Sequence, residues 1–137
     1  MLNLLRKELR LAVHPTSWIF LGLSLMLLIP SYPYYVAFFY TGLGIFFTCL
    51  SARENQDISY MLLLPLPKHD VVRARFVSSV LMELLQVATA AFTLVLHHFL
   101  IQTSNPVGMD ANIALLGLAL VELGLFNLVF FPLYYKN

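Results

Sequence analysis

Charged residues are scarce in this chain. Of its 137 residues, 60% are hydrophobic and only 11% are charged, against about 25% in a typical soluble domain. A soluble domain of this size could not cover its surface with so few polar groups. The composition therefore excludes an ordinary soluble protein and predicts an integral membrane protein whose apolar helices face lipid.

The chain also lacks the signatures of catalysis and of covalent cross-linking. Cys49 is its single cysteine, so neither an internal disulfide nor a cysteine-based metal site can form. The sequence contains no GxxxxGK[ST] phosphate loop, no HExxH zinc motif and no nucleophile elbow. We therefore expect no enzyme activity, no metal and no other cofactor on this chain, and no nucleic-acid partner.

Lysine and arginine are absent from two of the connections between the apolar runs. Four runs are predicted to cross the membrane, at about residues 17–29, 34–52, 76–101 and 112–135, although the first is shorter than the ~20 residues that a crossing needs. All eight lysines and arginines lie in the N-terminal segment, in the loop 53–75 or at the C-terminus. Because basic residues stay in the cytoplasm, we expect both termini and this loop there.

The fold class predicted from this pattern is all-α, a polytopic bundle of membrane helices that forms a single domain over residues 1–137. Residues 1–15 are predicted to form an amphipathic helix that lies in the membrane interface. Its apolar face carries Leu2, Leu5, Leu9, Ala12 and Val13, and its polar face, directed at lipid headgroups, carries Asn3, Arg6, Lys7, Arg10 and His14. Pro15 ends this helix, because proline disfavours the helical conformation in the residue before it.

The loop 53–75 is the longest polar interruption, and it contains a predicted short helix. Asp57 to Leu64 is long enough for two turns, with Asn55 or Asp57 as the cap, and Pro65 and Pro67 end it. Ile58, Met61 and Leu62 share one apolar face. Outside the membrane such a face must be covered, either by this protein's own helix ends or by a cytoplasmic partner.

A polar stripe runs along the third predicted crossing. Six residues fall within about a quarter of the helix circumference at 100° per residue: Ser79, Glu83, Gln86, Ala90, Thr93 and His97. Since an unpaired charge in hydrocarbon is costly, this stripe faces protein or water. The candidates for a translocation route are Glu83, Gln86, Thr93 and, in the fourth crossing, Glu122. The alternative is a structural role, with a protonated glutamate hydrogen-bonded between helices, and we expect no direct contact between Glu83 and Glu122.

Residues 57–75, DISYMLLLPLPKHDVVRAR, together with the basic N-terminal helix, resemble the permease subunit of bacterial type 2 ABC transporters. The end of the chain, residues 131–137, is similar to the end of that family's fourth helix. The resemblance implies an exporter in the bacterial plasma membrane, driven by a separate ATPase subunit that carries ATP and Mg, and a dimer with a second permease copy or paralogue. It implies a coupling helix that enters a cleft of the ATPase, with these coupling residues: Asp57, Ile58, Met61, Leu62, Leu63, Leu64 and Pro65.

The number of crossings departs from the family pattern. Members usually have six, whereas this chain offers four, so we expect it to be incomplete relative to the family or to be a reduced member. Two other functions stay open. A small dimeric proton-coupled multidrug antiporter would need an acidic residue in its first helix, and the first run here has none. A non-transporting immunity or assembly protein of the membrane is the third possibility.

Overall fold

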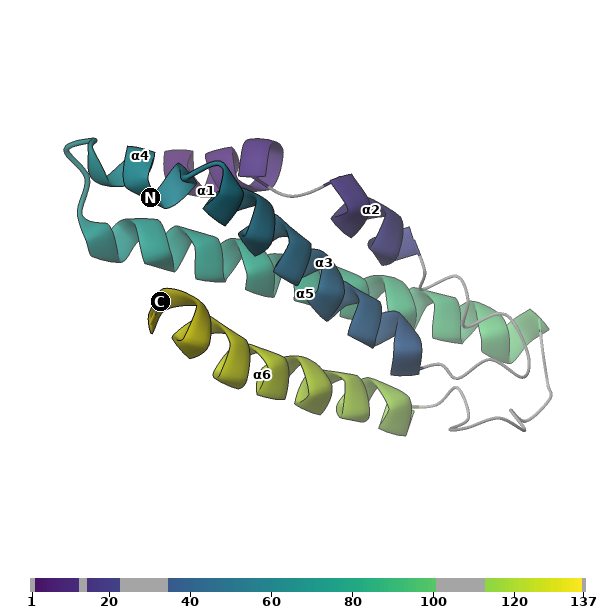
Figure 1. Ribbon diagram of the computed structural model, residues 1–137. Helices are drawn as coiled ribbons and strands as arrows, with labels where there is room; N and C mark the ends of the chain where they lie inside the picture. Colours follow the sequence, from purple (N-terminus) through teal and green to yellow (C-terminus); the bar gives the residue numbers. More distant parts are fainter. Residues whose placement is uncertain (1, 13–14, 23–34, 101–112, 137) are drawn as a thin grey trace.

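The computed structural model describes residues 2–12, 15–22, 35–100 and 113–136, and every element in these ranges is helical (Figure 1). The predicted all-α class is therefore confirmed for the described part of the chain. In chain order the elements are α1 (Leu2–Lys7), the π-helical η1 (Glu8–Ala12), α2 (Pro15–Gly22), α3 (Tyr35–Glu54), α4 (Asp57–Leu62), α5 (Lys68–Leu100) and α6 (Ile113–Lys136).

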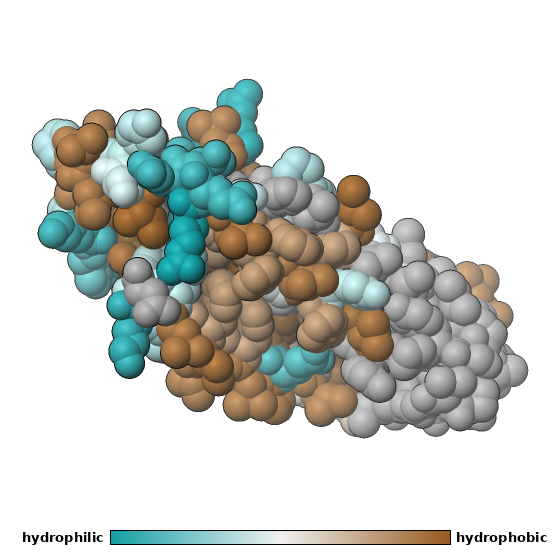
Figure 2. Space-filling view, in the orientation of Figure 1, coloured by the Kyte–Doolittle hydropathy of each residue, from teal (hydrophilic) through white to brown (hydrophobic). Residues whose placement is uncertain are grey.

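Three long helices, α3, α5 and α6, pack on one another, and the short elements lie against them. The start of α1, the short helix α4 and the end of α6 all lie at one end of the molecule (Figure 1). Hydrophilic side chains gather at that end, whereas the middle of the visible face is mostly hydrophobic (Figure 2). All eight lysines and arginines belong to element ends that meet there, which agrees with the charge asymmetry in the sequence.

Among the described residues, two helices are long and apolar enough to cross a membrane, namely α5 and α6. Helix α3 corresponds to the second predicted crossing but is not among them. Of the first predicted crossing, only the part within α2 is described. Residues 23–34, the connection 101–112 and residues 13–14 lie outside the described residues. The count of four crossings therefore stays a prediction.

Helix α5 begins at Lys68, eight residues before the predicted start of the third crossing. Residues 68–75, predicted to lie in the loop before this crossing, are already helical, and the repeat of inward-facing residues begins at Val71. Buried residues follow at three- and four-residue spacing through Ala74, Ser78 and Met82. The helix has 33 residues, or about 50 Å at 1.5 Å per residue, which exceeds the ~30 Å hydrocarbon layer. The helix is therefore longer than one crossing requires.

The core of the bundle consists of two small clusters. One joins Phe38 of α3, Ala90 of α5, and Leu115 and Ala119 of α6. The other joins Ile45 and Cys49 of α3 to Phe131 of α6. Cys49 is thus a buried, free thiol.

Gly44 permits a close approach of α2 to α3. A Cβ atom at this position would lie 3.2 Å from the Ser17 Cα atom and 3.1 Å from its Oγ atom. The Ser17 hydroxyl donates a hydrogen bond of 2.9 Å to the Gly44 carbonyl. Small residues allow such contacts between membrane helices, and here the contact fixes α2 against α3.

We predict that Gly44→Ala destabilises the protein, because the added methyl group would lie 3.2 Å from the Ser17 Cα atom, tighter than ordinary van der Waals contact, so that α2 would have to shift. Overpacking of this kind costs about 1–3 kcal/mol. Gly117→Ala is the matched control, since a Cβ atom at Gly117 meets nothing within 4 Å. Thermal unfolding in detergent measures both variants, and an equal midpoint for the two would contradict the packing argument.

Candidate functional site

The short helix α4 occupies the turn between α3 and α5 and packs against both. The chain enters it through Gln56, whose backbone is left-handed at φ 54° and ψ 33°. Neither Asn55 nor Asp57 caps the helix as predicted. Gln56 is the N-cap residue and makes no side-chain capping bond. The helix stops at Leu62, two residues earlier than predicted, and the prolines Pro65 and Pro67 follow.

Asp57, the first residue of α4, binds two cationic side chains. The Lys7 ammonium of α1 donates to both carboxylate oxygens, each at 2.8 Å. The Arg75 guanidinium of α5 donates to the Asp57 Oδ2 atom through Nη2. These contacts attach α4 at once to the N-terminal helix and to the long helix that crosses the membrane.

Arg75 is the centre of this arrangement. Its Nε and Nη2 atoms donate to the two oxygens of Glu8 at 3.0 and 3.1 Å, and both side chains are only 3% exposed. The third nitrogen, Nη1, lies 3.3 Å from the Tyr134 hydroxyl of α6. That hydroxyl donates in turn to the Cys49 carbonyl of α3 at 3.2 Å. We call Lys7, Glu8, Asp57, Arg75 and Tyr134 the ion network.

The ion network balances its charges. Two cations face two carboxylates, and a paired guanidinium and carboxylate in the bidentate arrangement make strong, directional hydrogen bonds. A buried pair of this kind contributes little net stability, but removing one partner leaves an uncompensated charge and costs about 3–5 kcal/mol. The network therefore joins α1, η1, α4, α5 and α6 at one place, and a shift of η1 against α5 would leave the buried Glu8 and Arg75 charges without their partner.

Asp57 stays ionised at neutral pH in this setting. Burial by itself would raise the pKa of its carboxyl group, but the hydrogen bonds and charges of Lys7 and Arg75 outweigh burial and lower the pKa below its usual value. The usual value is about 3.9. The ion pairs of α4 therefore persist across the physiological pH range.

The sequence pattern did not predict the contacts of this ion network. Lys7 was predicted to face lipid headgroups, but it lies on the protein side and binds Asp57, so that prediction is wrong. Glu8 was given no role, although it is the only acidic residue in an otherwise basic segment. Such an isolated acid, together with an arginine just before an apolar run, is a signal that could have suggested an inward-facing pair.

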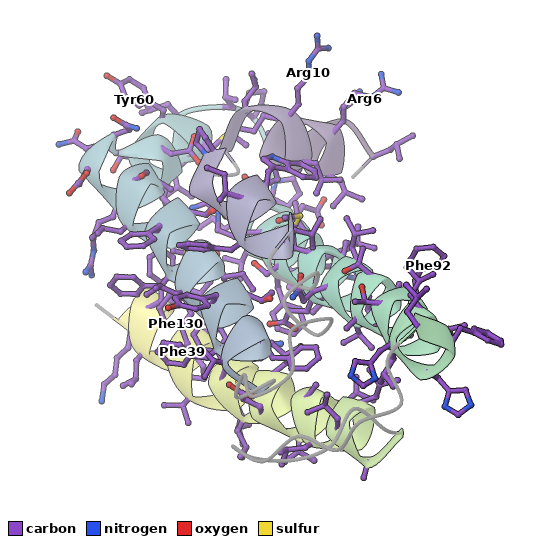
Figure 3. All side chains as sticks on the ribbon, turned by 90° about the vertical axis from the view of Figure 1, so that its right-hand side faces the viewer. Arg6, Arg10, Phe39, Tyr60, Phe92 and Phe130 are labelled. Carbon is purple, nitrogen blue, oxygen red and sulfur yellow. The ribbon has the colours of Figure 1, made fainter. Side chains whose placement is uncertain are left out.

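The apolar side chains of α4 divide into one that is buried and several that are exposed. Met61 is 8% exposed and packs within the protein, which is the first of the two predicted ways in which this apolar face could be covered. Leu63 is 82% exposed, and Tyr60, Leu62 and Leu64 are also exposed. Tyr60 points away from the bundle in Figure 3. Ile58 is partly buried and Pro65 is exposed. Asp57 and Met61 thus anchor helix α4. Leu62 at its end, and Leu63 and Leu64 just after it, face outward.

The polar stripe of α5 faces the interior, as predicted. All six of its residues are buried. The Asn127 amide of α6 donates to the Glu83 carboxylate at 2.6 Å, and Asn127 is a partner that the sequence pattern did not identify.

Gln86 is fully buried, and neither atom of its amide is hydrogen-bonded to a described residue. Glu83 Oε1 and Asn127 Oδ1 also lack such a partner. Buried polar atoms without a partner call for water or a ligand.

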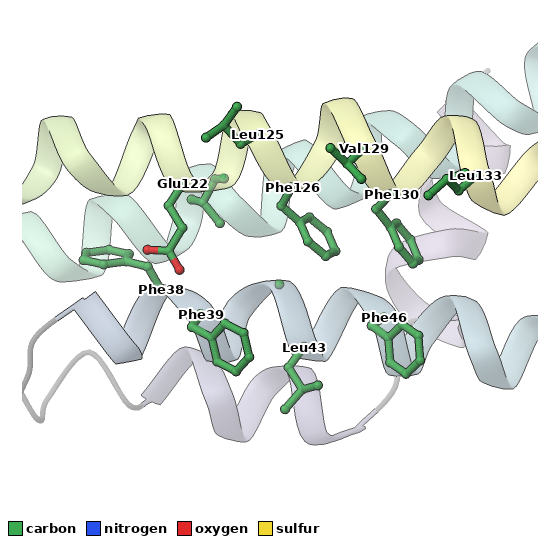
Figure 4. Close-up of a pocket in the computed structure, with 12 residues that line it drawn as sticks. Phe38, Phe39, Leu43, Phe46, Glu122, Leu125, Phe126, Val129, Phe130 and Leu133 are labelled. Atoms are coloured by element: carbon green, nitrogen blue, oxygen red, sulfur yellow. The ribbon is translucent and has the colours of Figure 1, made fainter.

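The other two predicted route residues are placed differently. The Thr93 hydroxyl donates to the Thr89 carbonyl one turn back, at 2.8 Å, so its own helix satisfies it. Glu122 lines an open hollow of about 530 Å³ between α3 and α6, and Figure 4 shows its carboxylate pointing toward α3 among phenylalanine rings. Asn127 follows Glu122 by five positions, or 140° around the helix axis. Glu122 therefore lies on a different face of α6 from the Glu83 contact.

Long apolar helices whose charged residues gather in a hydrogen-bonded network at one end are typical of a helical membrane protein. The family model described as ABC-2 family transporter protein matches residues 3–137, and the chain therefore belongs to this family. It is an ABC transporter permease of the ABC-2 type, as the resemblance indicated, and thus a membrane component of a transporter. Such components generally act with an ATPase and are not catalytic themselves. No curated protein and no solved structure matches the chain.

We predict that Arg75→Gln destabilises the protein by about 3–5 kcal/mol, because the Glu8 carboxylate would stay buried without its bidentate partner. Arg73→Gln is the matched control. Arg73 lies on the same helix two residues earlier but is exposed, and surface changes usually stay within about ±0.5 kcal/mol. The measurement is the free energy of unfolding in detergent.

A double-mutant cycle separates the ion pair from the packing of the side chains. The double variant Glu8→Gln with Arg75→Gln removes both charges, and we expect it to be more stable than Arg75→Gln alone. Additive losses in the two single variants would show that the contact between Glu8 and Arg75 carries no coupling energy.

Proposed function

We propose that this chain is the membrane-spanning subunit of a bacterial ATP-driven exporter. A separate ATPase subunit would carry the ATP and Mg, and a second permease copy or paralogue would complete the membrane part. Family membership supports a transporter component. The observation that carries the proposal is the ion network, which joins an exposed short helix to helices that run through the bundle.

Helix α4 is the element that the ATPase would engage. Its exposed leucines would enter an apolar cleft of that subunit, and the coupling residues are Asp57, Ile58, Leu62, Leu63, Leu64 and Pro65, with Met61 as the internal anchor. These exposed leucines belong to the charged end of the molecule, where apolar and hydrophilic side chains lie next to one another (Figure 2). Since basic residues stay on the cytoplasmic side, this arrangement supports a cytoplasmic location for both termini and for α4, next to an ATPase.

Movement of α4 would reach the membrane through Asp57. When the ATPase closes, a push on α4 would displace the Asp57 carboxylate, and the charge-assisted hydrogen bond between Asp57 and Arg75 would draw the guanidinium with it. Arg75 stands on α5, and its other nitrogens hold η1 and α6. A displacement at α4 would therefore reach α5 and α6 together.

The polar residues of the bundle supply the candidate route. Glu83, Gln86 and Thr93 share the buried face of α5, and Glu122 stands in the hollow against α3. The unpartnered atoms of Glu83 and Gln86 are groups that a polar substrate or water would satisfy. The substrate class beyond this polar requirement is left open.

We predict that Leu62→Asp with Leu63→Asp prevents capture of an ATPase by the tagged chain from native membranes. Burying two carboxylates in an apolar interface would lower recovery by at least about tenfold. The conservative variant Leu62→Met with Leu63→Met retains apolar contact and should recover the ATPase normally. Unchanged recovery in the aspartate variant would contradict the role of α4. Recovery of the chain alone, or with a client that is not an ATPase, would favour the antiporter or the assembly protein.

Thiol labelling tests the route in a Cys49→Ala background. Thr93 and Phe92 are neighbours, 1% and 65% exposed, and Figure 3 shows Phe92 pointing away from the bundle. We expect a membrane-impermeant maleimide to label Thr93→Cys in the transporter complex and not Phe92→Cys, because only a thiol in contact with water ionises and reacts. Absence of labelling at Thr93→Cys, with or without ATP, would show that the stripe only packs helices together.

A further inference from the structure

The outer face of α1 and η1 carries two arginines that the ion network does not use. Arg6 and Arg10 are four residues apart and both exposed. Figure 3 shows both side chains pointing away from the helices. In the described part of the chain, neither forms an ion pair or hydrogen bond. Their positive charges are therefore available to an external anion.

The other two charged side chains of α1 and η1 point inward, so the outer face of these elements carries only positive charge. Lys7 binds Asp57 and Glu8 binds Arg75. The π-helical segment η1 begins at Glu8, the residue that turns toward the interior. With Glu8 removed from the surface, no carboxylate of α1 or η1 competes for Arg6 and Arg10.

The two arginines border a hollow with an apolar floor. Six residues line its volume of about 570 Å³: Leu2, Leu5, Arg6, Leu9, Arg10 and Trp18. Trp18 comes from α2 and is 49% exposed. Leu2 and Leu11 of the same segment, and Ile19 of α2, are also exposed. Apolar side chains beside a tryptophan and unpaired arginines are typical of the boundary between acyl chains and headgroups.

We propose that this hollow is a binding site for one anionic phospholipid. The Arg6 and Arg10 guanidinium groups would hold the phosphate, for which their planar donor geometry is suited. The acyl chain would run over the leucines and the Trp18 indole, and its methylene groups would bury apolar surface there. The apolar floor distinguishes this occupant from a soluble anion, which would leave the leucines exposed. The site does not depend on whether α4 engages an ATPase.

Trp18 is the chain's single tryptophan and reports directly on the hollow. The full-length chain is reconstituted in phosphatidylcholine vesicles that contain a small fraction of phosphatidylglycerol with brominated acyl chains, which quench indole fluorescence on contact. The reference is the same fraction of brominated phosphatidylcholine. An arginine near an anionic surface contributes roughly a fivefold preference, so the pair predicts a preference of roughly 30-fold for the anionic lipid.

Matched variants decide whether the site is specific. Arg6→Gln with Arg10→Gln should abolish the preference. Arg73→Gln with Lys136→Gln removes the same charge from two other exposed positions and should leave it unchanged. Excess glycerol 3-phosphate should not displace the brominated lipid. Equal quenching by the two lipids, an equal loss in both double variants, or displacement by glycerol 3-phosphate would each overturn the proposal.

Discussion

A buried guanidinium needs a counter-charge, and this requirement organises the charged end of the protein. Arg75 lies almost wholly within the bundle, where an unpaired charge is strongly unfavourable. Glu8 from the N-terminal segment neutralises it, and it also binds Asp57 of the short helix, whose charge Lys7 balances. Three segments far apart in the sequence meet at this point. The packing of α1, η1 and α4 against α5 follows from this single constraint.

The constraint also explains why α4 can be both exposed and firmly held. Six residues of helix are too few to be stable alone, and the leucines of α4 gain nothing from contact with water. Met61 and Asp57 attach the helix to the bundle through one apolar and one ionic contact. The rest of its apolar surface stays exposed. In the proposed function, a helix anchored in this way would transmit a push, because separating the Asp57 carboxylate from Arg75 would be unfavourable.

The sequence predicts the local features of this structure better than its long-range contacts. Apolar runs and helical spacing predicted α3, α5, α6 and the inward-facing stripe, because these signals repeat every three or four residues. The start of α5 was placed too late because charged residues at 68–75 concealed the repeat that begins at Val71. The pair between Glu8 and Arg75 spans 67 residues, and no periodicity connects positions that far apart. Helical spacing placed Met61 on one apolar face with Ile58 and Leu62, but it cannot say which of these side chains the protein itself covers.

The two carboxylates inside the bundle illustrate the same difference between composition and contact. Glu83 and Glu122 look alike in the sequence, since both interrupt an apolar helix. Glu83 is buried and bound to Asn127, beside a glutamine whose amide has no described partner. Glu122 faces an open hollow lined by aromatic rings, on another side of α6. The Glu83 carboxylate, which has a hydrogen-bond donor on α6, links α5 to α6, whereas Glu122 has no donor among the described residues. The two surroundings therefore differ, and α6 contributes to both, since Asn127 and Glu122 stand on the helix that Tyr134 joins to the ion network.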